Sequence, residues 1–190
     1  FITPVEDPNV MYSFTHHVPH VFAFHGSKMS KGRHYDQVSG LAWPADLDIT
    51  EEGINATVTK VPEEFKERIR REVKTYHATE WGYNHQYTLM KSLRDWSAYW
   101  GGKLKIICVE VGCVDNIGES RYRFMEDLRK AMEENDIGWI YWAYNRTQFT
   151  VYLPGKNKPF LGYRPGEIPF LGDPNKEPTD EKMLNALFSE

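Results

Sequence analysis

The stretch KLKIICVEVGCVD, from Lys103 to Asp115, decides the fold of this chain. Its apolar run over residues 106–111 is typical of a parallel strand that is covered on both faces. Glu110 interrupts this run near its carboxyl end, and simple alternation predicts that it shares a face with Ile106 and Cys108. Because the carboxyl ends of parallel strands carry active sites, Glu110 is a candidate functional carboxylate. The alternative is a Glu beyond the buried region, solvated or paired with an Arg.

Composition sets wide bounds on the function. The 190 residues are 41% hydrophobic and 26% charged, with a net charge of -4, which favours a globular domain and argues against nucleic acid or an anionic membrane as partners. No apolar run approaches the roughly 20 residues that span a bilayer. The 14% aromatic content suits a carbohydrate site or a large core. Cys108 and Cys113 are too far apart in an extended strand for a disulfide, so we expect free thiols.

Four histidines follow a short predicted strand at residues 10–14. They are His16, His17, His20 and His25, and a group of this kind suggests either a zinc site or hydrogen bonding around a polar cleft. No acidic or cysteine ligand accompanies them at helical spacing, and Pro19 would break a helix that aligned them, so we expect no bound metal and no cofactor.

A long polar segment rich in Gly and Pro comes next, at residues 26–61. We interpret it as a loop that passes over a binding face, since long loops are uncommon unless they are functional. Trp43, followed by Pro44, is its rigid aromatic element. It either anchors the loop in the core or stacks against a sugar.

The remaining pattern alternates helices and strands. Apolar spacing and capping signals predict helices at residues 62–76, 84–100, 121–134 and 179–188, with a further strand at residues 138–144, GWIYWAY. This order predicts an α/β fold with parallel strands and helical crossovers. Trp142 and Tyr144 share one face at the end of the last strand, and both are candidate substrate-binding residues. Trp142 is therefore a candidate floor for a ligand site or, alternatively, a core Trp.

These segments together resemble a known family. NVMYSF with THHVPHVFAFHG, then ICVEVGCV, the helix from Arg121, and GWIYWAY are similar to the last three strand units of a glycoside hydrolase family 5 cellulase. The resemblance implies the carboxyl-terminal portion of a (β/α)8 TIM barrel and a secreted, extracellular enzyme. By this match Glu110 takes the position of the nucleophile, and Trp142 takes that of the Trp beneath the sugar.

The chemistry that the resemblance implies is retaining hydrolysis of a β-1,4-glucan by an endoglucanase. One carboxylate attacks the anomeric carbon, and a second carboxyl group roughly 5 to 5.5 Å away acts as acid and base. The Asn-Glu pair that supplies this second group in the family has no counterpart here. The family's His-x-Tyr is also replaced, with Thr15 and His17 at the two positions, so His16 or His17 is expected to orient Glu110 or a sugar hydroxyl.

A complete barrel needs eight strands and about 250 residues, whereas the pattern here gives only three strands. The chain is thus expected to be one domain or fragment spanning residues 1–190, and its start at Phe1 favours a processed or excised chain. The expected partners are a polysaccharide substrate and an amino-terminal half that supplies the acid/base. The alternatives are a hydrolase directed at mannan or mixed-linkage glucan, and a non-catalytic carbohydrate-binding protein that uses Trp43 and Trp142 as stacking platforms.

Overall fold

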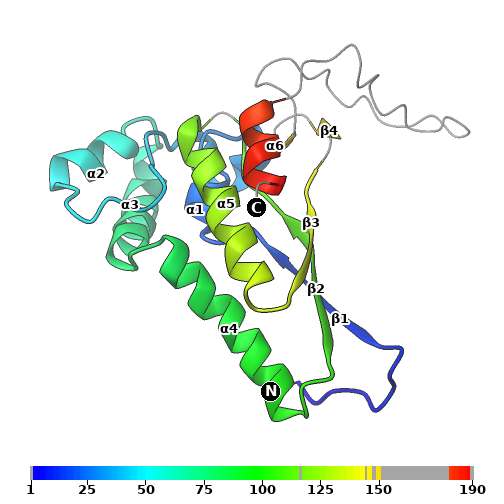
Figure 1. The fold of residues 1–190 in the computed structure, drawn as a ribbon. Coiled ribbons are helices and arrows are strands. Elements are labelled where there is room, and N and C mark those ends of the chain that lie inside the picture. The colour runs from blue at the N-terminus through cyan, green and yellow to red at the C-terminus, as the bar shows by residue number, and fades with distance from the viewer. Residues whose placement is uncertain (1, 116, 144, 147–148, 151–179, 189–190) are drawn as a thin grey trace, which may run out of the picture.

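A three-stranded parallel sheet is the centre of the molecule. The computed structural model describes residues 2–115, 117–143, 145–146, 149–150 and 180–188. Strands β1 (Met11–His16), β2 (Lys105–Val111) and β3 (Gly138–Tyr141) pair in the order β1-β2-β3. Figure 1 shows them side by side, with helices on one side of the sheet. The predicted α/β alternation with helical crossovers is therefore confirmed.

Helices of different lengths connect the strands. They are α1 (His20–Ala23), α2 (Glu51–Thr57), α3 (Glu63–Ala78), α4 (Tyr83–Tyr99), α5 (Glu119–Glu133) and α6 (Glu181–Phe188), with 3-10 turns η1 (Lys28–Arg33) and η2 (Tyr35–Gln37). A two-stranded antiparallel ladder joins β4 (Asn145–Arg146) and β5 (Phe149–Thr150). None of the helices in the described ranges is long and apolar enough to cross a membrane.

The two best-defined helices form where apolar residues recur at helical spacing. In α3, Ile69, Val73 and Tyr76 are at most 1% exposed, and the helix begins after Pro62 with two acidic residues in its first turn. Proline at this position and acidic residues there both favour a helix start. In α5, the stripe of Phe124, Leu128 and Met132 is fully buried. Each stripe packs into the core, as the spacing predicted.

The apolar spacing of residues 84–100 predicts that Met90, Leu93, Trp96 and Trp100 form the inner face of α4. Met90 is buried and Leu93 and Trp96 are half-buried, as expected for the inward stripe. Trp100 is 44% exposed, so its assignment to this stripe is wrong. The helix ends at Tyr99 and Trp100 is its C-cap, with φ -97 and ψ 24, so its side chain no longer follows the helical period.

A bulge in β2 decides which way Glu110 points. Phe14 pairs with Cys108 and the next residue of β1, Thr15, pairs with Glu110, so β2 contains one extra residue, Val109. Paired residues on adjacent strands share a face of the sheet, and a bulge shifts the alternation by one residue. The prediction that Glu110 shares a face with Cys108 is therefore wrong.

The two faces of the sheet differ in burial. Cys108 and Val111 are at most 1% exposed and belong to the core on the helix-covered face. Glu110 lies on the opposite face with Thr15, where Met11 and Ile140 are 56% and 51% exposed. The described residues thus cover only one face of the sheet, and Glu110 lies on the open one. Cys108 and Cys113 are free, as predicted.

Residues 26–61 are not the extended loop that their composition predicted. They contain η1, η2 and α2, and apolar residues spaced along them are buried: Tyr35, Val38, Leu41, Trp43, Ala45, Ile54, Val58 and Val61. These single apolar residues anchor the polar segment to α3 and α5. Because isolated apolar residues give no periodic signal, the segment was mistaken for a loop.

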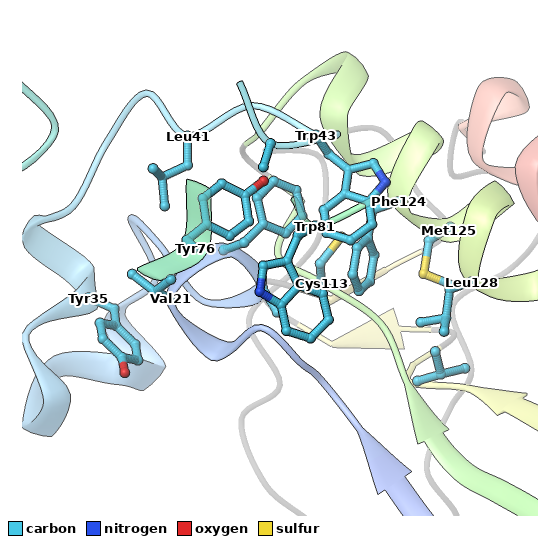
Figure 2. Close-up of a cluster of buried hydrophobic side chains, with 14 of the residues drawn as sticks. Val21, Tyr35, Leu41, Trp43, Tyr76, Trp81, Cys113, Phe124, Met125 and Leu128 are labelled. Carbon is cyan, nitrogen blue, oxygen red and sulfur yellow. The ribbon is translucent and has the colours of Figure 1, made fainter. Parts of the chain in front are cut away.

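Trp43 lies in this core, not at a sugar-binding surface. It is 1% exposed, and its ring packs against Phe22 and, edge to face, against Phe124 with centroids 4.8 Å apart. Its indole Nε1 donates a hydrogen bond to Asp127 of α5 at 2.9 Å. Figure 2 shows Trp43 among the buried aromatic side chains. Its assignment as a substrate-binding residue is corrected accordingly, in favour of the anchoring alternative.

A buried ion pair attaches α6 to α5. Arg121 is fully buried and its Nη1 donates to Asp180 Oδ2 at 3.1 Å, while Tyr122 donates to the same oxygen at 2.9 Å. The other carboxylate oxygen of Asp180 accepts the backbone N–H of Met183 at 3.2 Å, in the first turn of α6. The expected cap of this helix, Thr179, lies outside the described residues.

Candidate functional site at the carboxyl end of the sheet

Glu110 and His17 form the centre of the candidate site. The Nε2 atom of His17 lies 3.6 Å from Glu110 Oε2, and the two side chains are 11% and 37% exposed. Glu110 is the only acidic residue on the three strands of the sheet. His17 directly follows β1, so the two parallel strands bring both groups to the same end of the sheet.

The backbone determines which protonation states of His17 fit this geometry. Its Nδ1 lies 2.9 Å from the carbonyl oxygen of Gly112, which can only accept, so Nδ1 must carry a hydrogen. The Nε2 atom that faces Glu110 is therefore bare in the neutral ring and protonated only in the imidazolium. This geometry leaves the imidazole nitrogen nearest the carboxylate free of backbone partners, so it can act on Glu110.

Two aromatic rings hold the imidazole in place. His17 packs against Phe24 and Phe149, with ring centroids 5.5 and 5.7 Å away. Phe149 is 1% exposed and lies in β5. Neither ring was identified from the sequence as part of the site, since a Phe outside a periodic stripe carries no functional signal.

Gly112, two residues after Glu110, packs directly against the backbone of Trp142. A side chain at position 112 would place its Cβ 2.5 Å from the carbonyl oxygen of Trp142. The backbone N–H of Trp142 in turn donates to Val111 at 2.8 Å, which continues the pairing of the sheet beyond β3. The peptide bond that follows Trp142 is cis. Trp142 is half-buried and lies at the same end of the sheet as Glu110. A Gly immediately after the strand is the one local signal in the sequence for this contact.

His16 does not support Glu110. It faces the helix-covered side, where its Nε2 lies 2.8 Å from Gln86 Oε1, and Gln86 donates to the carbonyl of Val18 at 3.0 Å. Burial lowers the pKa of His16 to about 4, and the hydrogen bond to Gln86 offsets this only in part. Of the two histidines considered as support for Glu110, the structure brings only His17 to it.

The histidines as a group are not arranged to hold a metal. His25 Nδ1 lies 2.7 Å from the carbonyl of Phe22, and His16 and His17 have the separate partners given above. Within the described ranges, no three His, Cys, Asp or Glu side chains come together in a metal-binding arrangement. The zinc hypothesis therefore gains no support. The last candidate, Tyr144, lies outside the described residues.

Comparisons with known proteins give a match to structures only. No protein-family model matches the chain, and no curated protein matches it. Among solved structures, cellulose synthase subunit Z (CcsZ) from Clostridioides difficile superposes with a TM-score of 0.60 at 18% identity, covering 98% of this chain and 43% of that one. Endoglucanase Cel5A from Thermotoga maritima gives 0.59 at 16% identity, covering 99% and 42%. Cel5A in complex with mannotriose gives 0.58 at 15% identity, covering 98% and 42%.

The fold is that of part of a cellulase barrel. The chain spans fewer than half of the residues in the structures that it matches. This glycoside hydrolase-like fold agrees with the predicted carboxyl-terminal portion of a TIM barrel. It also explains the open face of the sheet, which in a closed barrel faces the interior. Within this fold, the bulge at Val109 turns Glu110 towards the open face of the sheet.

Proposed function

We propose that this chain is the nucleophile-bearing part of a retaining endo-β-1,4-glucanase. The observation that carries the proposal is the placement of Glu110. It is the only acidic residue on the sheet, it lies near the carboxyl end of the central strand, and it points to the open face with His17 Nε2 3.6 Å away. A buried structural Glu would instead be expected on the helix-covered face with a fixed cationic partner.

In the proposed reaction, Glu110 attacks the anomeric carbon while the glycosidic bond to the leaving sugar breaks. A second carboxyl group, roughly 5 to 5.5 Å away, protonates the leaving oxygen, and then removes a proton from the water that cleaves the glycosyl-enzyme. His17 Nε2 lies 3.6 Å from the Glu110 carboxylate, and it can donate to that carboxylate only as the imidazolium. Trp142 supplies an aromatic floor beneath the sugar ring, a common way to bind the apolar face of a carbohydrate.

The second carboxyl group belongs, in this proposal, to a polypeptide segment that completes the barrel. Two features of the sheet support a missing partner. Strands β1 and β3 each pair on one side only among the described residues, and the open face exposes Met11, Val109 and Ile140. Unpaired strand edges and exposed apolar residues are normally covered in native proteins. An extracellular site of action belongs to the same proposal and rests on the family resemblance alone.

Two other functions are compatible with particular observations. Cel5A has been solved with mannotriose, which favours mannan as a second substrate class for this fold. The absence of a second acidic residue on the three strands favours a carbohydrate-binding protein without hydrolysis. Retaining hydrolysis forms a covalent bond between the sugar and Glu110, whereas binding alone does not. This difference can be tested directly.

Covalent labelling tests the proposed nucleophile. The 190-residue chain is incubated with a dinitrophenyl 2-deoxy-2-fluoro-cellobioside, and peptides are analysed by mass spectrometry. Dinitrophenolate leaves without protonation, so the experiment does not need the second carboxyl group. We expect one fluoro-cellobiosyl adduct on the peptide that contains Glu110, and none in Glu110→Gln.

The outcomes separate the candidates. The matching mannobiose reagent, run in parallel, identifies the preferred sugar. Binding of the cellobioside without an adduct would favour the carbohydrate-binding protein, whereas an adduct on another carboxylate would contradict the role of Glu110. Native mass spectrometry of the protein isolated from its source then tests the partner, because a second polypeptide in the same complex is expected.

A further inference from the structure

A second candidate site lies between α3 and the segment that follows β1. It is a cavity of about 580 Å³, within the range of small-molecule sites. Its lining includes buried apolar and aromatic residues, namely Pro19, Val21, Tyr35, Tyr76 and Trp81, and the exposed His20 lies at its rim. Figure 2 shows Val21, Tyr35, Tyr76 and Trp81 in the region of the core that borders it.

One wall of the cavity is a polar stripe of α3. Arg68, Arg71, Glu72 and Thr75 of α3 line it together with the C-cap residue Thr79, and their spacing places them on one face of the helix. Hydroxyl groups beside guanidinium groups, over an aromatic base, are the complement of a sugar ring with an anionic substituent.

This wall carries two arginines and one acidic side chain, so positive charge is in excess. Glu72 is its only acid, and it already accepts hydrogen bonds from Tyr35 Oη at 2.6 Å and from Arg68 Nη1 at 2.9 Å. Arg68 also donates to the backbone carbonyl of Arg33 at 3.1 Å. Arg71 has no hydrogen bond or ion pair to any other described residue. One guanidinium group is therefore available to an incoming anion.

Ring contacts connect this cavity to the candidate active site. His20, at the rim, packs against Phe24 with centroids 5.7 Å apart, and Phe24 packs against His17, which faces Glu110. A single Phe thus separates a residue of the cavity from the residue beside the proposed nucleophile.

We propose that this cavity binds a carboxylate-bearing sugar unit, with Arg71 contacting the carboxylate and Thr75 and Thr79 contacting hydroxyl groups. The cavity then selects acidic polysaccharides, whose uronic acid units bind away from the bond that is cleaved. In naming the substrate class, the inference rests on the proposed function, but binding at the cavity is measurable without hydrolysis. A planar carboxylate matches the paired N–H donors of a guanidinium group, which explains the choice of arginine.

The test compares two disaccharides that differ only in the carboxylate. Calorimetric titrations of the Glu110→Gln chain are made with cellobiose and with cellobiouronic acid, in which glucuronic acid is β-1,4-linked to glucose. We expect the acid to bind about 5- to 10-fold more tightly, and the difference to shrink at high salt. Arg71→Gln should remove the difference. The matched control is Arg123→Gln, an exposed arginine of α5 outside the cavity, which should keep it.

Equal binding of the two disaccharides would overturn the proposal, and so would equal effects of the two arginine substitutions. Inorganic phosphate that displaced cellobiouronic acid at similar concentration would also overturn it, because the cavity would then recognise charge without sugar. A wrong assignment of Glu110 as nucleophile would give a different result. Glu110 would then take no covalent label, while the preference for the acidic disaccharide and its dependence on Arg71 would remain.

Discussion

His17 Nε2 lies 3.6 Å from Glu110 Oε2. Its other ring nitrogen is fixed on a backbone carbonyl, so the nitrogen that faces the carboxylate can carry a proton or leave it bare. This places a group that can change charge beside the only acidic side chain of the sheet. We therefore expect His17 to control the reactivity of Glu110, and we expect sugar binding to depend on it much less.

Replacing His17 tests this control. In His17→Gln, the rate of covalent labelling by the fluoro-cellobioside should fall about 10-fold, which corresponds to ~1.4 kcal/mol of transition-state stabilisation. The concentration of reagent that gives half-maximal rate should change little. The maximal labelling rate and the half-maximal reagent concentration, measured separately, provide the readout, since a merely structural role would change both. An unchanged maximal rate would exclude His17 as a positioning residue.

Gly112→Ala should distort the position of Trp142. The new Cβ would lie 2.5 Å from the Trp142 carbonyl oxygen and 3.3 Å from a ring carbon of Phe149, so backbone must shift. Overpacking of this kind costs ~1–3 kcal/mol. We expect lower stability in urea and weaker binding of cellobiose. The control is Gly32→Ala, where a Cβ would meet nothing within 4 Å, and its effects should stay within ~0.5 kcal/mol. Equal effects of both substitutions would contradict the close contact at Gly112.

The buried pair between α5 and α6 should dominate the attachment of α6. In Asp180→Asn, the fully buried Arg121 loses its charged partner, and the expected cost is ~3–5 kcal/mol in the free energy of unfolding. The matched exposed pair is Lys182 with Glu119, each 63% exposed, and Glu119→Gln should cost only ~0–1 kcal/mol. Urea denaturation of both variants measures the two losses in the free energy of unfolding. Similar costs would show that burial does not set the strength of the α5–α6 contact.

Trp43→Phe should affect stability and leave sugar binding unchanged. The substitution removes the indole N–H that donates to Asp127 and shortens a ring packed against Phe124. The loss of one such hydrogen bond and of packing should cost ~1–3 kcal/mol in thermal or urea unfolding. A weaker affinity for cellobiose, without lower stability, would restore Trp43 as a sugar-stacking residue.

His16 should make the protein less stable in mild acid. Burial lowers its pKa from 6.5 to about 4, so between these values the unfolded chain binds a proton that the folded chain does not. The contribution of His16 to the free energy of unfolding is therefore complete above pH 6.5. It falls as the pH drops towards 4, by up to ~3 kcal/mol. Burial also lowers the pKa of His25, which adds to the same trend. Urea titrations from pH 4 to 7.5 should show a shallower slope for His16→Gln. An identical slope would exclude His16 as a source of this dependence.

The amino-acid sequence by itself determined much of the framework. Helical spacing of Ile69, Val73 and Tyr76 predicted α3, and the apolar run around Glu110 predicted the central strand. These signals are local, because each depends on residues within one helix or strand. The alternation of helices and strands then predicted a parallel sheet, and its carboxyl end predicted where a site would lie.

Only the tertiary structure decided which side chains meet there. The direction of Glu110 depends on the bulge at Val109, which exists only because two neighbouring strands fix the register of β2. His17, and not His16, reaches Glu110 because consecutive residues at the end of β1 point to opposite sides. Trp43 is buried because α5 supplies a hydrogen-bond acceptor 84 residues further along the chain. Contacts between distant segments are set by the packing of the whole fold, so no local pattern could have predicted them.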